Sequence, residues 1–292
     1  MRCLPKTKNF MFEDMARHVP TGFWVLLRII ILIFVNYLLK ADNMKVAIIG
    51  YGRMGHLVEE VAKSRGLHIS CVIDADDTAK FASNEFKKSD VAIQFSTPDS
   101  AVEGILSCFA SKVPVVVGTT GWDKSLPEIK DMCEKGLGTV LYASNFSIGM
   151  NIFMAMNRYV TNIMNRFESY EPSLLEIHHV HKLDHPSGTA ISLANQLTSI
   201  STRFKKWIEK ELGEKPEKGF LPVYHKREGE VPGIHTITWE SDCDSIIMTH
   251  DTKNRLGFAR GAVSAAEWLA GKKGFFTIGD FLTDVTGIKG IF

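Results

Sequence analysis

Residues 45–55 read KVAIIGYGRMG, and this stretch decides the fold of the first half of the chain. It joins a short apolar run at 45–49 to three glycines with the spacing GxGxxG: Gly50, Gly52 and Gly55. The apolar residues that follow recur every three or four positions: Met54, Leu57, Val58, Val61 and Ala62. Such a recurrence is typical of an amphipathic helix. The stretch therefore predicts a β-strand, a tight glycine turn and a helix in direct succession.

A second strand is predicted at 68–73, and it ends in Asp74, 24 residues after Gly50. In this context the glycines let the backbone approach a pyrophosphate, while the helix N-terminus offers free N–H groups and the positive end of a dipole. An acid at the tip of the second strand can accept hydrogen bonds from the ribose of adenosine. The arrangement predicts a dinucleotide-binding site; the alternative is a tight turn that binds no ligand.

The alternation of strands and helices continues through the first half. Strands are predicted at 90–95, 113–117 and 139–142, and helices at 98–110 and 123–135. Strands separated by helices imply right-handed crossovers and a parallel sheet, whose ligands bind outside the carboxyl ends of the strands. Two segments follow such ends: Gly118, Thr119 and Thr120 after one strand, and Ala143, Ser144, Asn145 and Phe146 after the next. Both are predicted to line the cofactor cleft.

The order of elements changes after residue 146. We expect a helix at 149–167, a strand at 173–182, a helix at 187–203, a hairpin at 234–241 and 245–251, and a helix at 258–271 that returns to the first half. The predicted fold class is α/β, with a Rossmann-type parallel sheet domain and a second, α+β domain with a mixed sheet. The predicted domains are 44–146 plus 257–292, and 147–256, preceded by an extension at 1–43.

The second half contains a dense cluster of reactive side chains, EIHHVHKLDHPSGT at 176–189. His179 and His181 would share one face of the predicted strand, but no cysteine or nearby carboxylate completes a tetrahedral set of ligands. We therefore expect no metal. A chance gathering of surface histidines is a second interpretation of the cluster, and a catalytic site is the third.

The catalytic interpretation rests on the alternation of side chains along a strand. Glu176, His178, Val180 and Lys182 would all point to one side. Histidine titrates near neutrality, and lysine supplies a cation or a proton. His178 and Lys182 are therefore predicted to flank one substrate.

The end of the cluster, Pro186–Thr189, is predicted to open a helix. The N–H groups of Gly188 and Thr189, together with the Thr189 hydroxyl, would then form an anion pocket suited to a carboxylate. The alternative is an ordinary helix N-cap that binds no ligand. The pocket and the histidine cluster together favour a substrate that carries a carboxylate.

The stretch EIHHVHKLDHPSGTA resembles the signature of the 4-hydroxy-tetrahydrodipicolinate reductase (dihydrodipicolinate reductase) family. Further matching motifs occur in the same order along the chain: GYGRMG at 50–55, FSTP at 95–98, GTTGW at 118–122, ASNFSIGMN at 143–151 and NRLGFARGA at 254–262. The resemblance covers residues 44–292. Other Rossmann-type oxidoreductases lack the histidine-rich run, so the match is specific.

The resemblance implies a homotetrameric oxidoreductase, tetramerised through the sheet of its substrate-binding domain. It implies hydride transfer from NADH or NADPH to a cyclic dicarboxylate, with loss of water, in diaminopimelate and lysine biosynthesis. His178 would be the proton donor and acceptor and Lys182 a proton donor, with substrate contacts from His179, Gly188 and Thr189. The implied cofactor contacts are Gly50, Tyr51, Gly52, Arg53, Met54, Gly55, Asp74, Gly118, Thr119, Thr120, Ala143, Ser144, Asn145 and Phe146.

The chain departs from the common family pattern in three places. Its glycine loop is one residue shorter, and no family counterpart exists for residues 1–43. Many members carry Arg directly after the ribose-binding acid, whereas this chain has Ala75. An arginine there would pair with the 2′-phosphate of NADPH. The sequence therefore predicts that NADH is preferred.

The extension at 1–43 contains the apolar run FWVLLRIIILIFVNYLL at 23–39. The run is of borderline length for a membrane anchor and lacks the cleavage site of a signal peptide. We favour translation from Met44, where the first strand begins. The cysteines are five in number and form no CxxC pair: Cys3, Cys71, Cys108, Cys133 and Cys243. This pattern favours a reducing, cytoplasmic compartment.

Two alternative functions are compatible with a dinucleotide site. The first is another two-domain nicotinamide-dependent reductase of an amino-acid-derived substrate, against which the cluster at 176–189 argues. The second is an NADH-sensing regulator without chemistry, which would need a module that reads DNA or a partner. The formal net charge of +1 and the absence of a basic tail give no support for nucleic acid as a partner.

Overall fold

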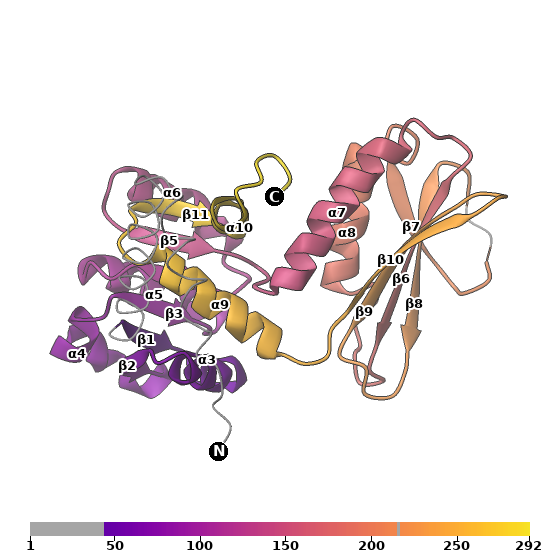
Figure 1. Cartoon of the computed structure of the whole chain (residues 1–292). Coiled ribbons are helices and arrows are strands. Elements are labelled where there is room, and N and C mark those ends of the chain that lie inside the picture. The colour runs from indigo at the N-terminus through magenta and orange to yellow at the C-terminus, as the bar shows by residue number, and fades with distance from the viewer. Residues whose placement is uncertain (1–43, 215–216) are drawn as a thin grey trace, which may run out of the picture.

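The computed structural model describes residues 44–214 and 217–292, which form two sheets, each with its own helices (Figure 1). The predictions for residues 1–43, an upstream extension or an anchor, lie outside these ranges. Within the described ranges, none of the helices is both long enough and apolar enough to cross a membrane.

The first sheet has six parallel strands in the order β11-β5-β4-β3-β1-β2. Its strands are β1 (Lys45–Ile49), β2 (His68–Ile73), β3 (Val91–Gln94), β4 (Val115–Val117), β5 (Thr139–Tyr142) and β11 (Gly274–Thr277). The strands are short and almost wholly apolar because helices cover both faces of the sheet. This is the predicted Rossmann-type arrangement.

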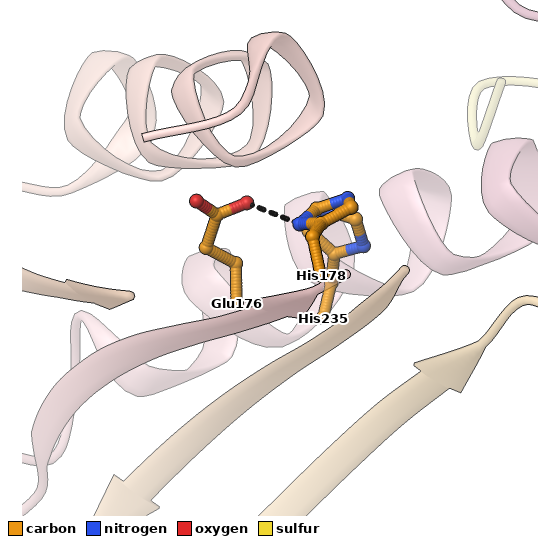
Figure 2. A group of neighbouring side chains, drawn as sticks. All are labelled: Glu176, His178 and His235. Carbon is orange, nitrogen blue, oxygen red and sulfur yellow. Dashed lines mark ion pairs between the residues drawn. The ribbon is translucent and has the colours of Figure 1, made fainter. Parts of the chain in front are cut away.

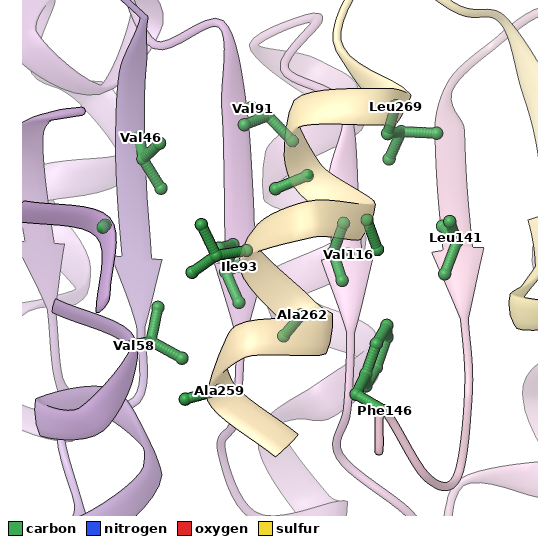
Figure 3. Close-up of a cluster of buried hydrophobic side chains, with 14 of the residues drawn as sticks. Val46, Val58, Val91, Ile93, Val116, Leu141, Phe146, Ala259, Ala262 and Leu269 are labelled. Carbon is green, nitrogen blue, oxygen red and sulfur yellow. The ribbon is translucent and has the colours of Figure 1, made fainter. Parts of the chain in front are cut away.

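The helices of the first sheet divide between its two faces. One face packs against α3 (Arg53–Ser64), α9 (Leu256–Leu269) and α10 (Ile278–Thr286). The other packs against α4 (Asn84–Lys87), α5 (Pro98–Ala110) and α6 (Leu126–Glu134), with 3₁₀ turns at Ala75–Ala82 and Asp123–Ser125. Figure 3 shows α9 lying across the strands, with Ala259 and Ala262 turned toward the sheet. The end of the chain thus returns to the first sheet.

The second sheet has five strands in the order β10-β9-β6-β8-β7. They are β6 (Glu171–His178), β7 (Lys206–Lys210), β8 (Phe220–Arg227), β9 (Ile234–Glu240) and β10 (Ser245–Asp251). The pairs β6–β9 and β9–β10 are antiparallel, while β6–β8 and β8–β7 are parallel, so the predicted mixed sheet is confirmed. The helices α7 (Ile148–Met164) and α8 (Gly188–Ile200) pack on one face (Figure 1).

Three strands and two helices were not predicted from the sequence: β7, β8, β11, α4 and α10. In β7, KWIEK, only two apolar residues lie between charged ones, so no alternation is visible. In β8 the proline Pro222 cannot donate to the hydrogen-bond ladder, which argues against a strand on local grounds. Pairing with neighbouring strands overrides these weak local preferences.

Candidate active site

A cleft of about 810 Å³ opens where β6 and β10 end, where β9 begins and where the loop before α9 begins. Five residues predicted from the sequence line it: His178, His179, Lys182, Thr189 and Asn145. Asn145 comes from the loop after β5 in the first sheet, whereas the other four come from β6 and the segment that follows it. The cleft therefore brings together both candidate catalytic residues, two of the three candidate substrate-binding residues and one candidate cofactor-binding residue.

Strand β6 positions the two central side chains of the site, Glu176 and His178. Residues two apart on a strand share a face, and here both side chains lie on the face that the helices cover. The Nδ1 atom of His178 lies 2.8 Å from Oε2 of Glu176 (Figure 2). This is the distance of an ion pair, although the ring N–H is not well aligned with the oxygen.

The Glu176 carboxylate is fully buried and has three polar neighbours. Its Oε1 accepts the backbone N–H of Ser187 at 3.0 Å and lies 3.2 Å from Nη2 of Arg227. Burial alone would raise the pKa of Glu176, but the contacts with His178 and Ser187 outweigh it and hold the pKa at about 2. An ionised carboxylate thus stands behind Nδ1 of His178.

The Glu176 carboxylate at Nδ1 of His178 leaves the other ring nitrogen, Nε2, to exchange a proton. With Nδ1 held by Glu176, the exchangeable position of His178 is Nε2. No described residue forms a hydrogen bond with Nε2, and the ring lines the cleft. The arrangement suits proton transfer between Nε2 and a molecule bound in the cleft.

A second buried histidine, His235 on β9, lies beside His178 (Figure 2). The two rings are nearly perpendicular, with centroids 5.2 Å apart, and Nε2 of His235 lies 3.3 Å from the Ser187 hydroxyl. Burial, and then the neighbouring charge of His178, lower the pKa of His235 to about 4. His235 is therefore uncharged at neutral pH, and it lines the cleft without adding a positive charge.

Potential metal-ligating atoms of Glu176, His178 and His235 lie within 4.8 Å of one another. The guanidinium group of Arg227 already neutralises Glu176 there, and a cation would meet this charge at close range.

The predicted strand at 173–182 is wrong in its second half, because β6 ends at His178. The chain then turns: the N–H of Val180 bonds to the carbonyl of Gly229, and the N–H of Lys182 bonds to that of His179. Side-chain alternation therefore does not place Val180 and Lys182 beside His178. The loop nevertheless brings Lys182 to the same cleft.

The side chains of this turn have interaction partners that were not expected from the predicted strand at 173–182. The ammonium group of Lys182 lies 2.7 Å from both oxygens of Asp184, and this contact lowers the pKa of Asp184. The rings of His179 and His181 are 6.0 Å apart, and Nε2 of His181 lies 3.1 Å from Glu230. His179 and His181 therefore do not form the shared strand face considered from the sequence.

Helix α8 begins at the predicted place, directly after Ser187. The Ser187 hydroxyl accepts the N–H of Ala190 at 3.2 Å and caps the helix. The N–H groups of Gly188 and Thr189 have no partner among the described residues, nor has the Thr189 hydroxyl, and Thr189 lines the cleft. The cap and the predicted anion pocket are thus compatible.

Replacing Thr189 with Val keeps the shape of the side chain but removes its hydroxyl. We expect KM for the substrate to rise about ten- to a hundredfold, because a hydrogen bond to a charged group contributes about 1.5–3 kcal/mol. Steady-state kinetics measure the effect. The control is Ser192→Ala, which removes a hydroxyl from an exposed position further along α8, where it bonds only to the carbonyl of Gly188. An unchanged KM in Thr189→Val would mean that this helix start only caps α8.

A second cavity, of about 440 Å³, lies at the carboxyl ends of β1 and β2 and is lined by Gly50, Tyr51, Gly52, Asp74 and Ala75 among others. Gly50 has φ +84°, and a Cβ atom there would lie 2.2 Å from the carbonyl oxygen of Phe95, so only glycine fits. Asp74 accepts the N–H of Tyr51 at 3.3 Å. The predicted strand–turn–helix–strand–acid unit therefore forms a concave site.

None of the other predicted cofactor residues lines this cavity, and Asn145 lines the larger cleft instead. Arg53, Thr120 and Ser144 are exposed, while Met54 and Phe146 pack into the core of the first sheet and Gly55, Thr119 and Ala143 are buried. The Thr119 hydroxyl accepts the N–H of Ser96 at 2.8 Å, and Gly118 packs against the Phe95 ring. For the buried side chains the structure shows a packing role.

Several residues of the site were not singled out from the sequence. His235 and Arg227 lie far along the chain from His178 and reach it only through the pairing of β9 and β8 with β6. Lys253 and Arg255 add two cations to the cleft from the loop before α9. The motif NRLGFARGA, which contains Arg255, was the available signal.

Two family models match consecutive parts of this chain. The model described as "Dihydrodipicolinate reductase, N-terminus" matches residues 44–146, and "Dihydrodipicolinate reductase, C-terminus" matches residues 149–282. Together the two matches extend over both sheets.

Comparison with individual proteins points to the same family. The chain is 45% identical over 242 residues to the 4-hydroxy-tetrahydrodipicolinate reductase of Christiangramia forsetii, covering 83% of this chain and 99% of that protein. It is 33% identical to the enzyme of the same name from Archaeoglobus fulgidus, covering 82% and 100%. A dipicolinate-bound dihydrodipicolinate reductase from Paenisporosarcina sp. TG-14 has a similar fold, with a TM-score of 0.65, 22% identity and coverage of 80% and 97%.

Proposed function

The chain belongs to the dihydrodipicolinate reductase family, and on this premise we propose that it reduces 4-hydroxy-tetrahydrodipicolinate to tetrahydrodipicolinate with loss of water. The electrons come from NADH or NADPH, and the reaction serves diaminopimelate and lysine biosynthesis. One observation carries the proposal: His178, backed by the ionised Glu176, opens onto a cleft that Lys182 and Thr189 also line. No metal takes part in the proposed reaction.

The residues around the smaller cavity fit a nicotinamide dinucleotide. No side chain of the described residues caps α3, so the N–H groups of its first turn are available to a pyrophosphate. No heavy atom lies within 4 Å of the position that a Cβ atom of Gly52 would take, which leaves room for the close approach of a phosphate. The Asp74 carboxylate would hold the adenosine ribose. When bound, the reduced nicotinamide supplies a hydride to the substrate.

The side chains of the larger cleft would bind the substrate and move its protons. The substrate is a dicarboxylate, and we assign one carboxylate to the first turn of α8, at Gly188 and Thr189, and to His179. Arg255, which has no ion-pair partner in the described ranges, and Lys253 provide further positive charge. The Paenisporosarcina reductase, which binds dipicolinate, supports a small dicarboxylate as the ligand.

Loss of the substrate hydroxyl as water transfers one proton to the leaving oxygen and releases one proton from the ring. Hydride reduction then returns one proton to the ring, so one hydride and one proton are consumed overall. We assign the proton exchanged at the ring to Nε2 of His178, because Glu176 holds Nδ1. We assign the other proton to the ammonium group of Lys182. Its contact with both oxygens of Asp184 fixes the position of the ammonium group.

NADH should be preferred over NADPH by about tenfold in kcat/KM. This factor corresponds to the free energy of about one charge-assisted contact. Asp74 can accept bonds from ribose hydroxyls but would repel a 2′-phosphate, and Ala75 adds no donor. Lys80, the nearest cation downstream, is already engaged by Asp77 at 2.6 Å and by the carbonyl of Val72 at 3.2 Å. Measuring kcat/KM for both coenzymes tests the prediction.

The matched variant for this prediction is Ala75→Arg, which restores the basic residue of many family members. It should raise kcat/KM for NADPH and leave the value for NADH nearly unchanged. Equal values for the two coenzymes in the unaltered protein would contradict the proposal and would point to Arg53, the exposed cation of the glycine loop.

Three further properties belong to the same proposal. The dinucleotide-binding domain comprises 44–146 plus 257–292, and the substrate-binding and oligomerisation domain comprises 147–256. The protein acts in the cytoplasm. It forms a homotetramer in which other subunits cover the face of the second sheet that carries no helices. Ile247 on β10, whose exposed fraction is 62%, supports a contact there. Sedimentation equilibrium gives the mass, and a monomer would contradict the tetramer.

The proposed activity can be tested with freshly prepared condensation product of aspartate semialdehyde and pyruvate. NADH absorbance should fall in proportion to the substrate added. Aspartate semialdehyde alone serves as the control, because another amino-acid-derived reductase would consume NADH with it. Binding of NADH without any oxidation would favour a regulator and contradict the proposal.

A further inference from the structure

A second group of metal-ligating side chains lies outside the active site: His185, Glu209 and His225. They come from three separate segments, namely the loop before α8, strand β7 and strand β8. Their ligand atoms all lie within 4.8 Å of one another. The Nδ1 atoms of His185 and His225 lie 2.6 Å and 3.0 Å from the same oxygen, Oε1 of Glu209.

The sheet fixes two of these side chains on one face. In the parallel ladder, Glu209 on β7 pairs with Val223 on β8, and His225 lies two residues further along β8, so both side chains share a face. The His185 ring stacks on that of His225, with centroids 4.4 Å apart and planes inclined by 17°. Both imidazoles thus present Nδ1 to the same oxygen of the Glu209 carboxylate.

The charges around the group leave it open to a cation. Glu209 has no lysine or arginine within ion-pair distance in the described ranges, so only the two imidazoles contact its carboxylate. This differs from the Glu176 group, where Arg227 takes the place of a cation. The His185 side chain is 51% exposed, which leaves one side of the group accessible to water.

We propose that His185, Glu209 and His225 bind a divalent transition-metal ion, preferentially Zn²⁺, with water as the fourth ligand. Two histidines, one glutamate and a water form an established ligand set for four-coordinate zinc, and imidazole nitrogen suits this metal. The sequence predicted no metal because only the run at 178–185 was considered. The three ligands are spread over 40 residues, and only the sheet brings them together.

Such a site would tie the loop at 179–187 to β7 and β8. His185 lies one residue from Asp184, the partner of Lys182, and two from Ser187, the cap of α8. A bound metal would therefore steady the segment that carries the side chains of the candidate active site. Metal binding itself does not depend on the proposed reaction, since its ligands lie outside the cleft.

Isothermal titration of the full chain with Zn²⁺ tests the proposal, with Co²⁺ as a spectroscopic probe. The unaltered protein should bind one more Zn²⁺ than His225→Gln, and the affinity at this site should fall at least tenfold in Glu209→Gln. The Co²⁺ complex should show the intense visible bands of four-coordinate geometry, and His225→Gln should lose them. Zn²⁺ should also raise the Tm of the unaltered protein more than that of His225→Gln.

The matched control is His181→Gln, which removes a histidine from an exposed His–Glu pair that lacks a third ligand. It should keep both the Zn²⁺ stoichiometry and the Co²⁺ bands. Equal Zn²⁺ binding by the unaltered protein and His225→Gln would overturn the proposal, and the group would then be an ion pair between two imidazoles and a carboxylate. NADH oxidation by the protein has no bearing on either outcome.

Discussion

Replacing His178 with Gln should lower kcat by about 10²–10⁴-fold and leave the affinity for NADH unchanged. Glutamine fills a similar volume but cannot exchange a proton at the position of Nε2. The Glu176 carboxylate would remain buried behind it, so the loss would come from the missing proton transfer. Steady-state kinetics give kcat, and fluorescence titration gives the affinity for NADH.

His179→Gln is the matched control, because His179 lines the same cleft but, unlike His178, forms no ion pair with a carboxylate of the described residues. This variant should raise KM for the substrate with a much smaller change in kcat. Full kcat in His178→Gln, or an equal loss of kcat in both variants, would remove His178 from the role assigned to it.

Replacing Glu176 with Gln should lower the free energy of unfolding by about 3–5 kcal/mol, because the partly buried guanidinium of Arg227 would then lose its carboxylate partner. Denaturant unfolding at neutral pH measures the difference. Glu230→Gln is the control: Glu230 forms a comparable pair with His181, but at the surface, where an ion pair contributes about 0–1 kcal/mol.

The pH dependence of the same variant gives an independent check. The pKa of Glu176 is about 2 in the folded protein and 4.5 as its ordinary value. A carboxyl with a depressed pKa stabilises the fold fully above pH 4.5, and this contribution disappears as the pH falls toward 2. The difference in unfolding free energy between the unaltered protein and Glu176→Gln should therefore shrink below pH 4.5. A difference that stays constant across this range would contradict the assignment.

Five of the six strands of the first sheet could be predicted from the sequence because their signals are local, whereas β11 was missed. The apolar run at 45–49 forms a buried strand, the glycines after it allow a tight turn, and Asp74 ends the next strand. Each of these features is required by the local geometry of a dinucleotide-binding unit. In the second half, β7 and β8 were missed because charged residues in β7 and Pro222 in β8 hide the strand pattern. Their positions are set by pairing with neighbouring strands.

The candidate site was predicted in part, and for a reason that was itself only partly correct. The alternation of side chains holds for Glu176 and His178 but not for Lys182, since β6 ends at His178. Lys182 reaches the cleft through a turn that Arg227 ties down by bonds to the carbonyls of Lys182 and Asp184. Contacts of this kind join residues more than 40 positions apart, and no local pattern reveals them.

The most direct test of the central claim follows substrate and coenzyme in one reaction. Freshly prepared 4-hydroxy-tetrahydrodipicolinate is incubated with NADH and either the unaltered protein or His178→Gln, and both the oxidised coenzyme and tetrahydrodipicolinate are quantified by mass spectrometry. We predict equal amounts of the two products with the unaltered protein, and a rate about 10²–10⁴-fold lower with the variant. NADH oxidation without tetrahydrodipicolinate, or equal rates for both proteins, would contradict the account.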